Sequence, residues 1–298
     1  MGHIPVLLKE VITALEPKDG AIIIDGTAGG GGHSAEILKH IGNTGTLIAL
    51  DWDDAAIALL KKKFANDPRV QYFVSNYAAL PRLIQAHHFQ KADGLLIDLG
   101  FSSDQLLRGR GFSFQSDDPL IMTYNDVSES LSAFLKHTTV AELTDIIRAY
   151  GEERYAPRIA KAIYEARTQV TTTRQLADVI QRAVPRSYER GRLHPATRTF
   201  QALRIYLNRE LENLEHVIAA VPDIVKPGGR VVIISFHSLE DRIVKTSFKT
   251  LASKGRIDIM TKKPISAEAH EIQQNPRARS AKLRAARIRS AEYEQNQN

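Results

Sequence analysis

Short apolar runs in the first hundred residues end on an aspartate, and helical patterns separate them. The runs that end in this way are 21–25, 46–51 and 92–98. Strands that alternate with helices predict βαβ units and a parallel sheet. In an open sheet of this kind the ligand crevice lies at the carboxyl ends of the strands. We therefore expect Asp25, Asp51 and Asp98 to converge on one edge of the sheet.

A glycine-rich turn, residues 26–32, follows the first run. Glycines at the start of a helix let the backbone approach a nucleoside cofactor closely. The turn is not a G-x-G-x-x-G, nor is it a P-loop, because no Gly-Lys-Ser/Thr follows. Asp51, at the end of the second strand, has the position of an acid that hydrogen-bonds ribose hydroxyls. Asp25 would repel a pyrophosphate and attract a cationic donor, which favours S-adenosylmethionine over a nicotinamide cofactor.

The sequence pattern changes in the middle of the chain. Residues 101–129 show neither the helical nor the strand period of apolar residues, and we predict a long loop or lid there. Helical patterns follow, including a long helix over 200–214, before a Pro-Gly-Gly turn leads into a strand at 230–235. We predict an α/β fold, a doubly wound Rossmann-like sheet with an inserted all-helical domain. The expected domains are 1–110 (methyltransferase domain, first part), 111–205 (helical substrate-recognition insert) and 206–298 (second part, with a basic tail).

Composition narrows the compartment and the class of partner. The chain has no cysteine, which excludes a disulfide scaffold, a cysteine zinc site and a thiolate nucleophile, and favours the cytoplasm. No run reaches the ~18 apolar residues that span a bilayer, so no membrane partner is expected. The net charge is +6, and arginines gather in 182–204 and 277–289. Such segments invite a polyanion such as RNA, with solvated helix faces as the alternative.

Eight motifs in order resemble one known family over nearly the whole chain. They lie at 3–8, 29–33, 98–103, 110–114, 150–154, 194–201, 235–242 and 275–280. Together they resemble the ribosomal RNA small-subunit methyltransferase H family. The resemblance implies a class I S-adenosylmethionine-dependent fold and N4-methylation of a cytidine in the decoding region of bacterial 16S ribosomal RNA. It implies the assembled 30S subunit as partner and leaves a homodimer open. Ile121 and Thr123 depart from the family, which usually has an acid and a base there.

The resemblance also implies which residues form the site. The donor-binding residues would be Gly31, Gly32, His33, Asp51, Tyr77, Asp98 and Gln105. Tyr77 offers an aromatic face to a purine, whereas Gln105 rests on the resemblance alone. The substrate-side candidates are Ser102, His194, Arg198, Ser235 and His237.

Asp98 is the candidate catalytic residue. Many amino methyltransferases have an Asp/Asn-Pro-Pro-aromatic turn after the fourth strand, and residues 98–101 stand there without the prolines. We expect Asp98 to accept the N–H of the cytosine amine, with binding of the donor's amino group as the alternative. Ser238 and Asp241, at the head of a helix, predict a cap and not chemistry. No metal is expected to be required.

Other functions remain open from the sequence. A cytosine-N4 DNA methyltransferase would share the donor site and the amine chemistry. A catalytically silent RNA-binding homologue would keep the fold and bind the donor without transfer. A nicotinamide-dependent oxidoreductase is disfavoured, because the chain lacks the dinucleotide fingerprint and a positioned Tyr-x-x-x-Lys.

Overall fold

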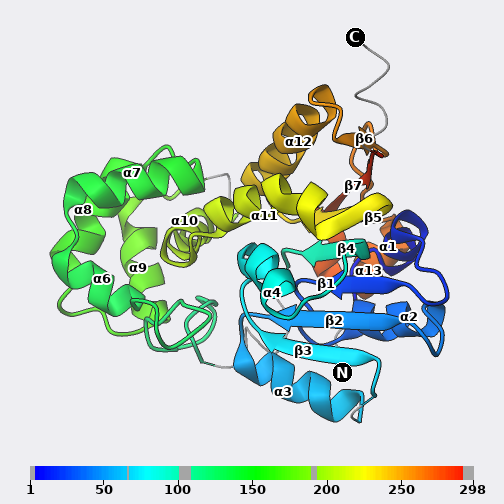
Figure 1. Ribbon diagram of the computed structural model, residues 1–298. Helices are drawn as coiled ribbons and strands as arrows, with labels where there is room; N and C mark the ends of the chain where they lie inside the picture. The colour runs from blue at the N-terminus through cyan, green and yellow to red at the C-terminus, as the bar shows by residue number, and fades with distance from the viewer. Residues whose placement is uncertain (1–3, 66, 101–108, 189–192, 291–298) are drawn as a thin grey trace. The chain divides into compact units, whose positions relative to one another are not determined.

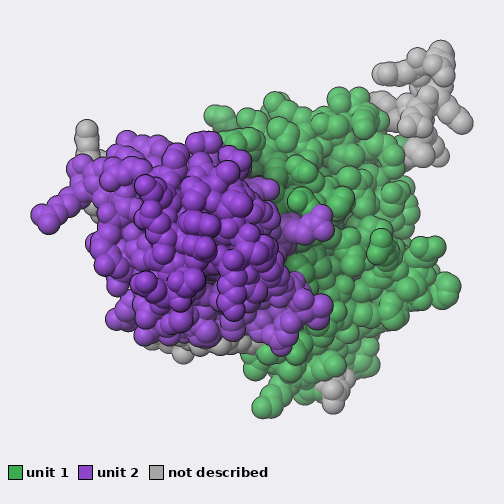
Figure 2. All heavy atoms as spheres, turned by 90° about the vertical axis from the view of Figure 1, so that its left-hand side faces the viewer, with its two compact units in different colours: residues 1–102, 211–298 green, residues 103–210 purple. Residues whose placement is uncertain are grey.

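The computed structural model of this chain describes residues 4–65, 67–100, 109–188 and 193–290. The chain forms two compact units, one from residues 1–102 and 211–298 and the other from residues 103–210 (Figure 2). The first unit contains the sheet, and the second is helical. Among the described residues, no helix is long and apolar enough to cross a membrane.

A single sheet is the centre of the first unit. Its described strands run in the order β3-β2-β1-β4-β5-β7-β6 (Figure 1). They are β1 (Ile22–Asp25), β2 (Thr46–Asp51), β3 (Val70–Val74), β4 (Ala92–Asp98), β5 (Val225–Ser235), β6 (Ile257–Ile259) and β7 (Lys282–Ile288). The first five strands are parallel, and β7 is antiparallel to β5 and β6. The strand order reverses between β1 and β4, which is where a doubly wound sheet binds its ligand.

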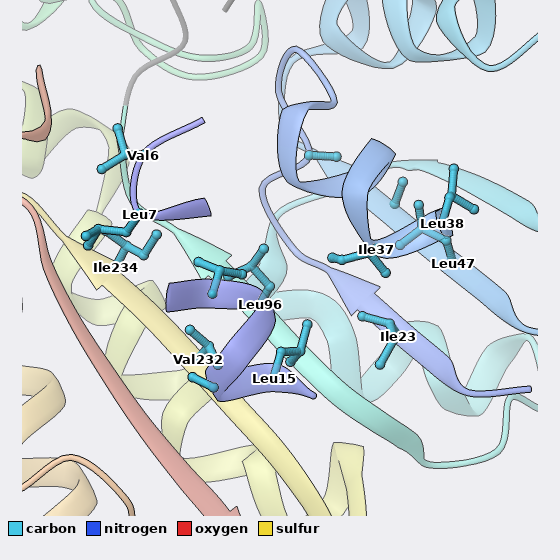
Figure 3. Packing of buried hydrophobic residues seen from close by; sticks show 14 of the residues in the cluster. Val6, Leu7, Leu15, Ile23, Ile37, Leu38, Leu47, Leu96, Val232 and Ile234 are labelled. Atoms are coloured by element: carbon cyan, nitrogen blue, oxygen red, sulfur yellow. The ribbon is translucent and has the colours of Figure 1, made fainter. Parts of the chain in front are cut away.

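Helices cover both faces of this sheet because strand residues alternate between the faces. Ile23 and Leu96 pack with α1 (Leu8–Leu15), α2 (Gly32–His40) and α3 (Asp54–Lys63), as Figure 3 shows for part of this cluster. Ile24 and Ile97 pack against the opposite layer. That layer consists of α4 (Leu80–Ala86), α11 (Glu210–Ile224) and α12 (Ser238–Ser253). The structure is thus the doubly wound α/β fold predicted from the sequence.

The Pro-Gly-Gly turn lies within β5, not before it. In the ladder with β4, Val225 pairs with Ala92 and Arg230 with Gly94. The residues 226–229 therefore bulge out of the ladder, helped by Gly228 at φ 82°. The prediction that this strand begins at residue 230 was wrong because the turn does not end the pairing.

The long helix expected over 200–214 is two helices. The first is α10 (Ala196–Asn208), and α11 follows it after a single residue, Arg209. Arg209 has a left-handed backbone with φ 50°, which ends the helical hydrogen bonding of α10. A non-glycine residue rarely adopts this conformation, so the residue types in this segment do not predict a break.

The second unit is a bundle around its own apolar core. Its other described helices are α6 (Leu131–His137), α7 (Val140–Gly151), α8 (Ala156–Ala166) and α9 (Thr173–Ala183). Arg110 organises the loop before α6, donating from Nε to Thr123 O at 2.7 Å and from Nη2 to Asn125 O at 2.8 Å. Thr123 is buried, and its hydroxyl donates to Asn125 O at 2.9 Å. Thr123, one of the two departures from the family, therefore helps to hold this loop together.

The basic C-terminal segment is part of the fold. After α13 (Ala269–Gln274) and a 3-10 turn η3 (Pro276–Ser280), it enters the sheet as β7. Arg284 donates from Nε to Asp241 at 2.7 Å, and Arg289 donates from Nε to Asp258 at 2.6 Å. Much of its charge is thus met by carboxylates of the same unit.

Candidate cofactor site at the carboxyl edge of the sheet

β1, β2 and β4 end side by side on Asp25, Asp51 and Asp98, as expected. The three carboxylates differ in exposure: Asp25 is 1% exposed, Asp51 is 6% exposed, and the side chain of Asp98 is 12% exposed. They therefore cannot share one role. The most exposed of them, Asp98, has the best access to a reacting group.

Asp25 holds the glycine turn in place. Its Oδ2 accepts the Ser34 hydroxyl at 2.6 Å, and its Oδ1 accepts the Thr27 N–H at 3.3 Å. Burial raises the pKa of Asp25, opposed by the Ser34 hydrogen bond and by His33. This burial corrects the expectation that Asp25 attracts a cationic donor directly, because the carboxylate lies beneath the turn and not on its surface.

Asp51 has the geometry of a ribose acceptor. Its Oδ2 accepts the Gly29 N–H at 2.8 Å, and its Oδ1 accepts the Asp53 N–H at 2.9 Å. A carboxylate oxygen has two lone pairs, so each oxygen keeps one for a further donor. Burial raises the pKa of Asp51 to about 6. The two oxygens fit the adjacent hydroxyls of a ribose.

The glycine turn is shaped by its contacts with α3. Gly31 has φ 69°, and a Cβ built on it would lie 2.5 Å from Leu60 Cδ2. Lys63 Nζ donates to the carbonyls of Gly30 and Gly31 at 2.8 and 2.9 Å. A side chain on Gly31 would thus collide with α3, and one on Gly32, where α2 begins, would lie 3.0 Å from Pro5 Cβ. The approach of a cofactor to this turn stays a prediction.

His33 connects three parts of the site. Its Nε2 lies 2.9 Å from Val6 O, and because a carbonyl only accepts, Nε2 carries the proton. Its Nδ1 lies 3.7 Å from Asp98 Oδ2. Asp98 also receives the Gly100 N–H on Oδ1 at 3.0 Å and donates its own N–H to Thr27 Oγ1 at 2.7 Å. Asp98 is therefore held by both the turn and its own loop.

Thr27 and Ser34 contribute to the site although the sequence does not single them out. Thr27 joins the turn after β1 to the end of β4, and Ser34 holds the buried carboxylate of Asp25. Hydroxyl residues near a glycine turn are too common to single out, and their partners are known only once the strands are placed. The structure identifies them by their hydrogen bonds to Asp25 and Asp98, the last residues of β1 and β4.

The other predicted donor residues divide into two groups. Tyr77, in the 3-10 turn η1 (Tyr77–Ala79), lies beside the glycine turn, since a Cβ built on Gly26 would be 3.3 Å from Tyr77 Cβ. The start of its side chain is thus next to the end of β1. Gln105, and Ser102 on the substrate side, lie outside the described residues.

The structure gives the candidates near β5 other contacts. Ser235 is buried, and its hydroxyl donates to Lys282 O at 3.3 Å. His237 is the N-cap of α12 and forms a capping box with Glu240, whose carboxylate accepts the Phe236 N–H at 2.7 Å. The cap expected from Ser238 and Asp241 therefore lies one residue earlier along the chain.

The remaining substrate-side candidates lie in the helical unit. The exposed ring of His194 stacks on Phe114, with centroids 4.6 Å apart and an interplanar angle of 17°. Its Nδ1 accepts the Ala196 N–H at 3.2 Å, which leaves Nε2 as the protonated nitrogen of the neutral ring. Arg198 is in α10, half-buried. The candidates thus divide between two separately folded units.

Comparisons with known proteins agree on one family. The model described as the MraW methylase family matches residues 1–289. A relative from Geotalea uraniireducens is 47% identical over 305 residues, covering 95% of this chain and 97% of its own. One from Koribacter versatilis is 45% identical over 296 residues, covering 96% and 93%. Both are named ribosomal RNA small subunit methyltransferase H.

Solved structures are more distant. An rRNA methylase from Streptococcus thermophilus matches with a TM-score of 0.44 and 8% identity, covering 95% of this chain and 94% of its own. The family assignment rests on the sequence matches, which cover nearly the whole chain at high identity. This chain belongs to the MraW methylase family.

Proposed function

We propose that this chain transfers a methyl group from S-adenosylmethionine to the exocyclic N4 of a cytidine in the decoding region of bacterial 16S ribosomal RNA. The chain belongs to a family of S-adenosylmethionine-dependent methyltransferases, and its relatives are named as methyltransferases of small-subunit ribosomal RNA. The proposal adds the amino position, the decoding region and the assembled 30S subunit, with the enzyme in the cytoplasm. The observation that carries it is the partly exposed Asp98 carboxylate beside the donor site.

The residues of the first unit fit this donor. Asp51 has an oxygen for each ribose hydroxyl, and Tyr77, beside the glycine turn, would offer its ring to the adenine. When bound, S-adenosylmethionine supplies an electrophilic methyl group on a sulfonium. The cationic sulfonium suits an edge where the partly exposed carboxylate of Asp98 lies.

Asp98 acts on the amine of cytosine. The lone pair of this amine is delocalised into the ring, which makes it a poor nucleophile. A fixed carboxylate that accepts one amine N–H favours a pyramidal nitrogen, whose lone pair is no longer shared with the ring, and stabilises the positive charge that develops there. As the N–C bond forms and the C–S bond breaks, S-adenosylhomocysteine leaves and the carboxylate takes up the proton that the methylated nitrogen releases. Gly100 holds Oδ1 in place, so Oδ2, on the side of His33, is the oxygen we assign to the amine.

The helical unit, residues 103–210, recognises the RNA. RNA is read largely through unpaired bases that stack on aromatic side chains and through arginine contacts to phosphate. The exposed His194 ring, backed by Phe114, offers a stacking surface. Arg198 follows one helical turn later in α10 and would reach phosphate or base edges from the same segment.

Asp98→Asn tests the catalytic role. At saturating donor we expect turnover on 30S subunits to fall by about 10²–10⁴-fold, while S-adenosylhomocysteine still binds. Asp223→Asn, which removes an exposed carboxylate of α11, should leave both unchanged. Near-normal turnover of Asp98→Asn would remove the acceptor role. Loss of donor affinity with little change in turnover at saturation would instead assign Asp98 to the donor's amino group.

A further inference from the structure

A cavity of about 670 Å³ lies at the amino edge of the parallel strands, opposite the donor site. The end of α1, the starts of β1 and β4, the bulge of β5 and the ends of β6 and β7 surround it. The charged residues that line it are Glu16, Lys18, Asp93, Lys226, Arg230, Asp258, Arg287 and Arg289. All of them belong to the first unit, so the cavity is formed within one folded body.

The cavity exists because the apolar core stops short of this edge. On β5, Val232 and Ile234 enter the core under α1, and Arg230 is the next residue on the same face. The bulge at 226–229 carries the chain away from β4 at this point. Among the described residues, nothing lies within 4 Å of a Cβ built on Gly228. Arg230 thus lies where the apolar core under α1 ends.

Two arginines face each other across this edge. Arg230 and Arg287 are direct partners in the antiparallel ladder of β5 and β7, so their side chains project from the same face. Like charges in directly opposed positions are destabilising. Burial lowers the pKa of Arg230, and the charge of Arg287 lowers it further. The two guanidinium groups therefore repel each other across the ladder.

The carboxylates of the cavity are shared. Glu16 pairs with Arg230 and lies 3.7 Å from Lys18 Nζ. Asp258 pairs with Arg287 at 3.3 Å and with Arg289 at 2.6 Å. The third carboxylate, Asp93, is 2.5 Å from Lys226 Nζ and also accepts the Ile22 N–H at 3.0 Å. Among the described residues that line the cavity, five cations thus share three carboxylates.

We propose that this cavity binds a phosphodiester group of the substrate RNA, at a distance from the nucleotide that is methylated. Guanidinium groups bind phosphate oxygens through paired N–H donors, and an anion placed between Arg230 and Arg287 removes their repulsion. Lys18 and Arg287 have side chains 73% and 55% exposed, so they can reach a backbone that passes over the opening. The choice of RNA as the source of the phosphate rests on the proposed function.

The double variant Lys18→Gln/Arg287→Gln tests this site. The probe is a short fluorescein-labelled single-stranded oligoribonucleotide, and its dissociation constant is measured by anisotropy over a range of KCl concentrations. We expect binding about tenfold weaker at low salt. The slope of log K against log salt should become shallower by about 0.7 for each phosphate group that the variant no longer neutralises.

The matched control is Lys61→Gln/Lys62→Gln, which removes two exposed charges from α3 in the same unit. The control should bind RNA nearly as the natural chain does. Equal weakening in the two double variants would show an effect of net charge alone and would overturn the proposal. Unchanged S-adenosylhomocysteine binding, followed by fluorescence of the single tryptophan Trp52, verifies that both variants fold.

A second arm separates RNA from small anions. Inorganic phosphate and AMP are titrated against the natural chain and against Lys18→Gln/Arg287→Gln. Loss of phosphate or AMP binding with RNA affinity unchanged would assign the cavity to a small anion and overturn the RNA assignment. Because RNA affinity is measured without methyl transfer, a failure of the proposed activity would leave this result standing. If the activity holds, the variant should raise the KM for 30S subunits and leave kcat unchanged.

Discussion

His33 places its two ring nitrogens on different parts of the donor site. Nδ1 lies 3.7 Å from Asp98 Oδ2, and Nε2 donates to Val6 O at 2.9 Å. The N-terminal segment that His33 contacts is held from the other end of the chain as well. Asn275 Nδ2 donates to Ile4 O, across 271 positions, and Glu271 accepts the Leu7 N–H, across 264. Residues 4–7 and 271–275 thus meet on the side of His33 that faces away from the candidate catalytic carboxylate.

Replacing His33 should weaken both the fold and the donor site. His33→Ala leaves the buried carbonyl of Val6 without its donor, which costs about 1–3 kcal/mol in the free energy of unfolding. It also removes the ring that lies beside Asp98 Oδ2, so S-adenosylhomocysteine affinity should fall by about tenfold or more. Urea denaturation and a Trp52 fluorescence titration measure the two effects. His40→Ala, on the exposed side of the same helix, should change neither, and an equal loss there would contradict this role.

Asp51 should make donor binding depend on pH. Its pKa is raised to about 6 by burial, so the carboxylate is charged above that pH and neutral below it. Only the charged form accepts from both ribose hydroxyls. S-adenosylhomocysteine affinity should therefore fall by up to about tenfold per pH unit below 6. Asp51→Asn should bind weakly with a flat profile, whereas a flat profile for the natural chain would rule out this contact.

Protonation of Asp51 should stabilise the fold, although it weakens donor binding. The folded pKa of Asp51 lies above its ordinary value of 3.8, so the folded state holds the proton more tightly. Its stabilising contribution is full below about pH 3.8 and is lost as the pH rises to about 6. Above that, a shift of about two units corresponds to a cost of about 3 kcal/mol. Between pH 4 and 7 the free energy of unfolding of Asp51→Asn should therefore increase relative to that of the natural chain. Urea titrations of both proteins at each pH measure this difference. A difference that does not change with pH would contradict burial of the charge.

Asp241 should stabilise the fold through Arg284. Burial alone would raise the pKa of Asp241, but Arg284 and Lys282 lower it below its ordinary value. A lowered folded pKa contributes stability that is present above about pH 3.8 and is lost as the pH falls through the folded pKa. Asp241→Asn leaves the buried Arg284 without its charged partner and should cost about 2–3 kcal/mol at pH 7 in denaturant titrations.

The control for this pair is Asp258→Asn. Asp258 also pairs with two arginines, but its side chain is 35% exposed, and water screens the interaction. We expect a loss of about 0–1 kcal/mol there. Losses of equal size in the two variants would show that burial does not set the strength of these pairs.

The strands before residue 100 were predictable because each is an apolar run between turn residues. β2 and β4 begin and end where the pattern places them. The strand β7 was not predicted, because basic residues at Lys282, Arg284 and Arg287 interrupt its apolar pattern. These charges are tolerated inside a sheet only because Asp241 and Asp258 come from other elements to meet them, and the local sequence does not indicate such partners.

The candidate site was likewise predictable from local sequence features but not from contacts between distant elements. The sequence placed three aspartates and a glycine turn at one edge, since strand ends and glycines are local features. It could not rank the aspartates, because their burial depends on what packs over them: Ser34 and Thr27 cover Asp25, while Asp98 keeps partial access. Likewise, His237 became a helix cap because α12 begins at the next residue.

The proposed activity can be measured as transfer of labelled methyl from S-adenosylmethionine to 30S subunits that lack the modification. Digestion of the 16S ribosomal RNA and nucleoside mass spectrometry then identify the product. We expect label in N4-methylcytidine from the decoding region. Absence of label on 30S subunits, in a preparation that binds S-adenosylhomocysteine, would contradict it, and label on cytosine in DNA alone would assign the same site to a different nucleic acid.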